Sequence, residues 1–295
     1  EGLTPYRYGV ASAAGVTVPA DRLTALGPAH AGWAVRNAAL PAATRFALLR
    51  QAAVLGTLSA EELASGVAAL APADASGGFA ADSRAGRLRD AFTGSAADRA
   101  EAIAAIAGDT AEDGYGALLE AATAAAALKP AAALAGQSDV IIAALLAAGN
   151  TRAARAWWPV AQEAGDDVRV RAQALLAAGA GVAMDSGDVR AWRAAAKASP
   201  RREAMLVAAL SGLGQARGLD RDGIKAISNR WTAALASAAR RRAAGEVALL
   251  ATTGLQGGWA DVPPAHVEAI VAALVACGRV TEARLFAAEA ITRSA

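Results

Sequence analysis

The chain has 295 residues, of which about 90 are alanine; 55% are hydrophobic, 4% aromatic and 19% charged. The hydrophobic content and a formal net charge of only +2 exclude a disordered chain, which combines low hydrophobicity with high net charge. The longest apolar runs, such as residues 140–148, have nine residues, about half the 18 or so needed to span a bilayer.

This composition predicts an all-α fold. Alanine is the strongest helix former, whereas the aromatic and β-branched residues that favour a large sheet are scarce. The single cysteine, Cys277, excludes an internal disulfide. Charges of both signs are scattered along the chain, so the sequence gives no reason to expect a nucleic-acid partner.

The chain begins Glu1-Gly2-Leu3, with neither an initiator methionine nor a basic-then-apolar leader. This start favours a processed, exported protein or a piece of a longer one. The cysteine content leaves the compartment undecided.

Three segments follow one another along the sequence. Residues 1–40 carry Pro5, Pro19 and Pro28, are closed by Pro41, and are expected to be irregular, with one short helix near 21–26. Residues 41–130 form a helical segment. In it Ser59 and Glu62 make a capping box that starts a helix at 60–71. A loop at 72–86 is then followed by helices at 87–93, 96–107 and 115–128.

Residues 131–295 contain helical hairpins. Apolar residues at 140–148 and 154–161 have helical spacing on either side of a Gly149-Asn150 turn, and those at 267–275 and 283–291 flank Gly278-Arg279 in the same way. Residues 141–149 also align letter by letter with 270–278, and 206–214 are a third copy.

The glycines that end these segments are 30 to 40 residues apart, at Gly149, Gly179, Gly214 and Gly254. This period indicates one hairpin per repeat. The pattern resembles the tetratricopeptide-like α-solenoids over residues 134–295, although their fixed Trp-Leu-Gly-Tyr pattern is absent. The resemblance implies an α-solenoid of antiparallel helical hairpins with a concave binding face; a globular helical bundle is the alternative.

No catalytic constellation is visible. His30 and His266 stand alone and are interpreted as solvated, and the common nucleophile and phosphate-loop motifs are missing. The nearest approach to a metal site is an EF-hand-like run with Asp109, Asp113 and Glu120, but Ala111 offers no oxygen at the third position, which favours an ordinary turn. We therefore expect no enzyme activity, no cofactor and no metal.

The tryptophans and arginines are the remaining candidates. Arg240, Arg241 and Arg242 fan around a helix and are interpreted as a solvated face. Trp157 and Trp158 are about 100° apart, so at most one is expected wholly in the core. Exposed aromatic and arginine side chains supply much interface energy, and the residues selected for partner contact are Trp158, Trp192, Arg155 and Arg193.

Two functions are compatible with these features. The first is a non-catalytic helical-repeat scaffold that mediates protein–protein interaction or assembly. The alternative is an accessory helical domain of an exported cell-wall-acting enzyme whose catalytic part lies outside this chain. The absence of catalytic residues favours the scaffold, with a protein partner whose identity the sequence leaves open.

Overall fold

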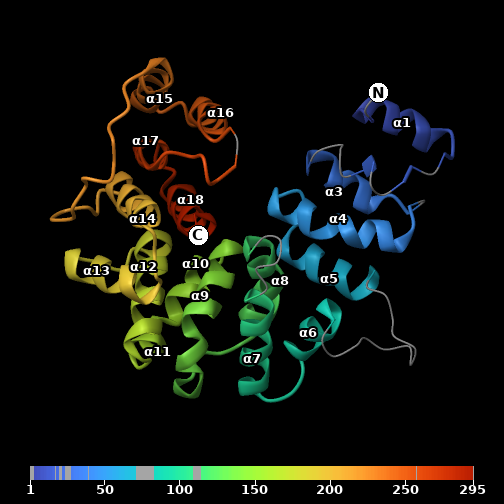
Figure 1. The fold of residues 1–295 in the computed structure, drawn as a ribbon, viewed down its shortest axis with the longest axis horizontal. Coiled ribbons are helices and arrows are strands. Elements are labelled where there is room, and N and C mark those ends of the chain that lie inside the picture. Colours follow the sequence, from blue (N-terminus) through green and yellow to red (C-terminus); the bar gives the residue numbers. More distant parts are fainter. Residues whose placement is uncertain are drawn as a thin grey trace. The chain divides into compact units, whose positions relative to one another are not determined.

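The computed structural model describes residues 3–16, 18–19, 22–23, 28–38, 40–70, 83–108, 114–256 and 258–294. These residues form seventeen α-helices and one 3₁₀ helix, with no strand among them, which confirms the all-α prediction (Figure 1). None of the helices so described has the length and apolar character needed to cross a membrane. The chain divides into two compact units, residues 1–129 and 130–295.

The N-terminal unit is built around α8 (Gly114–Ala126), which contacts α4, α5, α6 and α7. Nearly every residue of α8 from Gly116 to Ala125 is buried, because a helix that is apolar on all sides needs neighbours on all sides. The other helices of this unit are α1 (Pro5–Ala13), α3 (Pro28–Arg36), α4 (Ala42–Val54), α5 (Ala60–Leu70), α6 (Arg84–Asp90) and α7 (Ala96–Ala107).

The expectation that residues 1–40 are irregular is wrong where the structure describes them, because α1 and α3 lie there. The prolines were interpreted as breakers, but Pro5 and Pro28 each stand in the first turn of a helix, where proline has no amide bond to lose. Thr4 completes the start of α1 by accepting from the Arg7 amide at 3.2 Å. Most of the short helix expected at 21–26 lies outside the described residues.

The predicted capping box is confirmed at the start of α5. Ser59 Oγ accepts from the Glu62 amide at 3.1 Å, and Glu62 accepts in return from the Ser59 amide at 2.8 Å. Arg36 of α3 donates to the same carboxylate at 2.8 Å, which ties α3 to α5. Downstream, α6 begins at Arg84, earlier than expected, because Ser83 caps it; residues 72–82 of the expected loop lie outside the described part of the chain.

The C-terminal unit contains the two expected hairpins, α9 with α10 and α17 with α18, each with its members in contact. The helix expected across 154–161 is interrupted at Trp157. Pro159 has no amide hydrogen to donate to the Arg155 carbonyl, four residues earlier, and its ring would clash with that carbonyl. The helices of this unit are η1 (Ala132–Gln137), α9 (Ser138–Ala147), α10 (Thr151–Ala156), α11 (Trp158–Gln162), α12 (Asp166–Ala180), α13 (Ser186–Ala195), α14 (Pro200–Gly212), α15 (Arg230–Arg240), α16 (Ala244–Gly254), α17 (Pro264–Ala276) and α18 (Val280–Arg293).

The spatial order of these helices differs from their order in the chain. The last helix, α18, packs against α9 and α12 as well as against α14 and α17 (Figure 1). In a linear solenoid each repeat contacts only its neighbours in sequence. The two hairpins are present, but because α18 contacts helices far from it in sequence, their arrangement as a solenoid is not confirmed.

The repeated glycine is explained by one type of helix end. Beyond α9, the Asn150 amide donates to the Leu145 carbonyl at 2.8 Å and the Gly149 amide to Leu146 at 2.9 Å, and Gly149 has φ +76°. These are the two hydrogen bonds of a Schellman motif, whose left-handed residue is usually glycine. Gly214 and Gly278 occupy the same position after α14 and α17, and Lys197 and Arg242 occupy it after α13 and α15.

Gly179 and Gly254, in contrast, do not end helices in this way. Gly179 lies inside α12, and a Cβ there would come within 2.7 Å of the Leu146 side chain; the left-handed residue after α12 is Gly181. Gly254 is the last residue of α16 and is covered by Trp231. The apparent period of 30 to 40 residues therefore mixes turn-forming glycines with glycines that admit a neighbouring side chain.

Candidate binding groove

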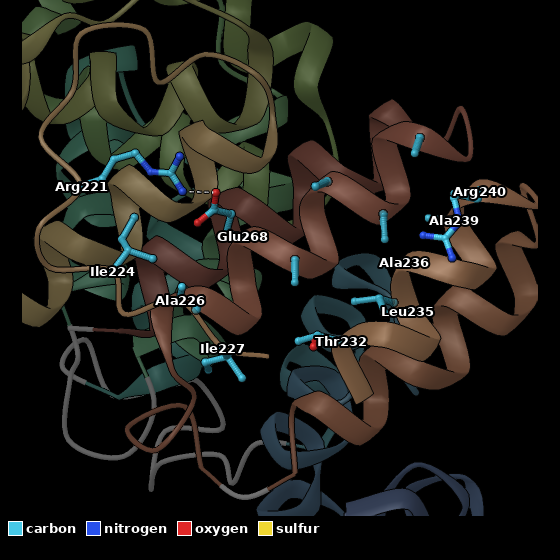
Figure 2. Close-up of a pocket in the computed structure, with 15 residues that line it drawn as sticks. Arg221, Ile224, Ala226, Ile227, Thr232, Leu235, Ala236, Ala239, Arg240 and Glu268 are labelled. Atoms are coloured by element: carbon cyan, nitrogen blue, oxygen red, sulfur yellow. Dashed lines mark hydrogen bonds and ion pairs between the residues drawn. The ribbon is translucent and has the colours of Figure 1, made fainter. Parts of the chain in front are cut away.

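A groove of about 590 Å³ lies between α15 and α17 in the C-terminal unit (Figure 2). The segment that connects α14 to α15 contributes Arg221, Ile224, Ala226 and Ile227 to its lining. The two helices line it with residues three or four apart, so each presents one face. These residues are Thr232, Leu235, Ala236, Ala239 and Arg240 on α15 and Ala265, Glu268, Ala269, Ala272, Ala273 and Ala276 on α17.

The floor of the groove belongs to the core of the unit. Leu235, Ala239 and Ala273 are buried in a cluster with Ile270, which holds α15 against α17. Ala236 of α15 and Ala272 and Ala276 of α17 are exposed, whereas Ala265 and Ala269 are half-buried. Methyl groups fill little space, so the facing sides of α15 and α17 remain open above a packed floor.

Glu268 fixes one end of the groove. Its Oε1 accepts from the Ser211 hydroxyl of α14 at 2.6 Å. It also accepts from the Arg221 guanidinium at 2.5 Å, the contact drawn in Figure 2. These hydrogen bonds join the connecting segment, α14 and α17. The half-buried Ile224 and Ile227 are thereby held beside α17, and the Glu268 carboxylate is already occupied by two donors.

Arg240 lies at the other end of the lining drawn in Figure 2. It is the last residue of α15, where a cation complements the helix dipole, and its side chain is exposed. Its neighbour Arg241 pairs with Glu246 at 2.6 Å, whereas no acidic residue within the described ranges pairs with Arg240. The three arginines thus differ in position, and only Arg240 faces the groove.

The surroundings of the groove are basic. Residues 215–243, which run from the loop after α14 to just beyond α15, carry seven basic and two acidic side chains, a net charge of +5; two of the seven, Arg221 and Arg241, pair with glutamates outside this range. The whole chain has a net charge of +2. The positive charge is therefore concentrated in this part of the chain, and two of its arginines, Arg221 and Arg240, line the groove.

An aromatic cluster beside the groove connects α15, α16 and α17. The rings of Trp231 and His266 lie 4.3 Å apart, and the Trp231 indole donates to the Leu250 carbonyl at 2.7 Å. His266 Nδ1 lies 2.8 Å from the Gly254 carbonyl, which can only accept, so this nitrogen carries the proton. The expectation of a solvated His266 is wrong: the ring is half-buried and has a structural partner.

The residues selected from sequence do not form this groove. Trp192 is buried beneath Arg202, whose guanidinium carbon lies 5.6 Å from the ring centroid, so its selection as an exposed contact is wrong. Burial in turn lowers the pKa of Arg202. Arg193 is exposed and pairs with Glu203 at 3.1 Å.

Trp157 and Trp158 divide as predicted: Trp157 is buried and Trp158, the first residue of α11, is half-buried. Arg155 is exposed on α10. None of the four selected residues is among those that line the groove.

Potential metal ligands do not cluster in the residues that the structure describes. Within them, no three His, Cys, Asp or Glu side chains gather as metal ligands would. Residues 109–113 of the EF-hand-like run lie outside the described part of the chain. Glu120, its twelfth position, is buried and forms an ion pair with Arg84.

Comparisons with protein-family models, with curated proteins and with solved structures found no match to this chain. The sequence search for chemistry missed the groove because alanine carries no functional group. The available signals were the spacing of alanines along 265–276 and the basic excess of 215–243.

Proposed function

We propose that the chain is a non-catalytic helical scaffold that binds another protein through the groove between α15 and α17. The observation that carries this proposal is the groove itself, whose packed apolar floor is continuous with exposed alanines on both helices. Apolar surface left open between two helices is the usual site for an additional helix or peptide.

The polar groups of the groove favour a protein over a small molecule. A small ligand is usually oriented by several convergent polar groups. Here the Glu268 carboxylate is engaged by Ser211 and Arg221, and Thr232 is engaged by Asn229 in the cap of α15. The remaining lining is almost entirely methyl and aliphatic, which suits broad contact with another chain.

The hairpin pattern contributes to the same proposal. In the scaffold we propose, α15 with α16 and α17 with α18 act as stacked hairpins, each of which buries one face of the next. Small residues at their contacts, such as Gly212 of α14 against α17, let backbones approach closely. In a rigid array of this kind the binding surface has the same shape whether or not a partner is bound.

The test fills the groove without disturbing its floor. Ala236→Leu and Ala272→Leu place larger side chains at exposed lining positions, and Ala248→Leu adds the same volume at an exposed position of α16 outside the lining. We expect both groove variants, and not Ala248→Leu, to lose the complex that the tagged chain forms in its native source, as measured by sizing and quantitative pull-down.

Two results would contradict the proposal. If all three variants retained the complex equally, the groove would not be the binding surface. If the unaltered chain were recovered alone, with no larger species on the sizing column, the scaffold function itself would fail. Circular dichroism of each variant checks that its helical content is unchanged.

A further inference from the structure

We infer that the groove accepts an amphipathic helix with small apolar residues on its buried face and acidic residues beside that face. This inference rests on the proposed function and specifies the partner's chemistry. It depends on two independent features, the shape of the groove walls and the charge around them.

The walls favour a helix because α17 already accommodates one on another side. There α14 packs so closely that a Cβ on Gly212 would come within 2.7 Å of both the Glu268 carbonyl and the Val271 Cβ. Small residues permit this approach of two backbones. On the groove side, α17 presents Ala265, Ala269, Ala272 and Ala276, so a second helix can approach it with small residues at the contact.

The floor supplies the apolar contacts that such a helix would bury. Leu235 of α15 and the half-buried Ile224 and Ile227 of the connecting segment line the groove together with the alanines. The Glu268 hydrogen bonds to Ser211 and Arg221 hold the connecting segment in place, so these isoleucines are positioned before a partner arrives. Preorganisation of this kind lowers the entropy cost of binding.

The charge around the groove selects an acidic partner. Arg240 projects at one end with no acidic partner among the described residues, and residues 215–243 keep an excess of positive charge after Arg221 pairs with Glu268 and Arg241 with Glu246. At the other end Arg221 is only partly satisfied by Glu268, because a guanidinium has five donor hydrogens. Carboxylates flanking the apolar face of a bound helix would meet both arginines, which favours such partners over basic ones.

The experiment uses a fluorescein-labelled peptide of alternating alanine and leucine at one helical face, with glutamates flanking that face, and a matched peptide with lysines instead. Binding to the full chain is followed by fluorescence anisotropy. We expect the glutamate peptide to bind at least about tenfold more tightly than the lysine peptide, and its affinity to fall as salt is raised.

Three variants distinguish the groove from general attraction to a basic surface. Ala272→Leu should abolish binding of the glutamate peptide, and Arg240→Glu should weaken it at least about tenfold. Arg152→Glu makes the same change in charge at an exposed position of α10 outside the lining, and should leave the affinity within about twofold.

The inference is overturned if the lysine peptide binds as tightly, or if Arg152→Glu weakens binding as much as Arg240→Glu. Self-association of the chain that Ala272→Leu abolishes would identify a second copy as the occupant and would also overturn it. If neither peptide binds while Ala272→Leu still disrupts the native complex, the proposed function stands and this description of the partner fails.

Discussion

Trp231 occupies the space that a side chain on Gly254 would need. A Cβ built on Gly254 would lie 2.8 Å from the Trp231 Cε2 and 2.9 Å from its Cη2. The indole nitrogen also donates to the Leu250 carbonyl, one turn earlier in the same helix. The contact joins α15 to α16 and depends on glycine at one position and a hydrogen-bonding aromatic ring at the other.

The substitution Gly254→Ala is therefore expected to lower the free energy of unfolding, by about 1 to 3 kcal/mol, because the added methyl group forces Trp231 out of place. Alanine is the better helix former by up to about 1 kcal/mol, so a gain would be expected without this contact. Urea denaturation followed by circular dichroism measures the change.

Gly245→Ala is the matched control for this prediction. Gly245 lies in the first turn of the same helix, and a Cβ there would meet nothing within 4 Å. This variant should be as stable as the original chain or more stable by up to about 1 kcal/mol. Equal effects at the two glycines would contradict the role assigned to Trp231.

Lys197 and Arg242 are expected to reduce stability through their backbone conformation. Their φ values are +47° and +55°, and they occupy the Schellman position that is glycine at 149, 214 and 278. A non-glycine residue pays about 1 to 2 kcal/mol for this conformation, offset in part by the greater freedom of glycine in the unfolded chain. Arg242→Gly and Lys197→Gly should each raise the free energy of unfolding by up to about 1 kcal/mol.

The control for these two substitutions is Arg241→Gly. Arg241 has φ −80° and pairs with Glu246, so glycine there gains nothing and removes an ion pair. In thermal unfolding, the midpoint of Arg241→Gly should lie below that of the original chain. The midpoints of Arg242→Gly and Lys197→Gly should lie above it. A stabilised Arg241→Gly, or a destabilised Arg242→Gly, would argue against backbone strain as the cause.

Glu62 makes the stability of the N-terminal unit depend on pH. Hydrogen bonds from the Ser59 amide, then from Arg36 and the Ser59 hydroxyl, lower the pKa of Glu62 from 4.5 to about 2. A lowered pKa in the folded state means that the ionised carboxylate stabilises the fold above pH 4.5, and that this contribution is lost as the pH falls toward 2. Glu62→Gln should therefore be less stable at pH 7, with a deficit that shrinks between pH 4.5 and 2.

Thermal midpoints measured at intervals across that range test this dependence. Glu61→Gln makes the same change in charge in the same helical turn without the bonds to Ser59 and Arg36. Its deficit at pH 7 should be smaller than that of Glu62→Gln, because no such bonds are lost. If the stability deficit of Glu62→Gln did not change with pH, the substitution would destabilise the fold for reasons other than the lost charge.

Local signals in the sequence predicted much of the helical structure. Helix 96–107 and the Ser59–Glu62 capping box follow from rules that involve residues a few positions apart, and both are confirmed. The same rules were misapplied where one residue type has two roles. Pro5 and Pro28 start helices rather than break them, and Gly179 lies inside α12, where it admits the Leu146 side chain, rather than at the end of a helix.

Longer-range relationships were beyond those signals. The burial of Trp192 beneath Arg202 and the contact of α18 with α9 depend on which elements meet in space. The groove depends on which faces remain uncovered after the helices have packed, and an alanine in its wall is identical in sequence to an alanine in the core. Only the basic excess of 215–243 could be seen in the sequence, and part of it, Arg240 to Arg242, was interpreted as a solvated face.

Arg155, selected from sequence for partner contact, has an electrostatic effect within the fold. Arg284 of α18 donates to the carbonyls of Ala177 and Ala178 at the end of α12, and its pKa is lowered by burial and then by the nearby charge of Arg155. Because Arg155 repels a cation that the fold uses, Arg155→Gln should raise the free energy of unfolding by a few tenths of a kcal/mol at low salt.

Salt and a neighbouring arginine test this last prediction. At about 1 M salt the Debye length falls to roughly 3 Å, so the gain from Arg155→Gln should disappear. Arg152→Gln removes a charge three residues earlier on α10, from a residue that does not lower the pKa of Arg284, and should leave stability unchanged at both salt concentrations. Because the gain requires like charges close together in the fold, identical behaviour of the two variants would mean that Arg155 does not repel Arg284.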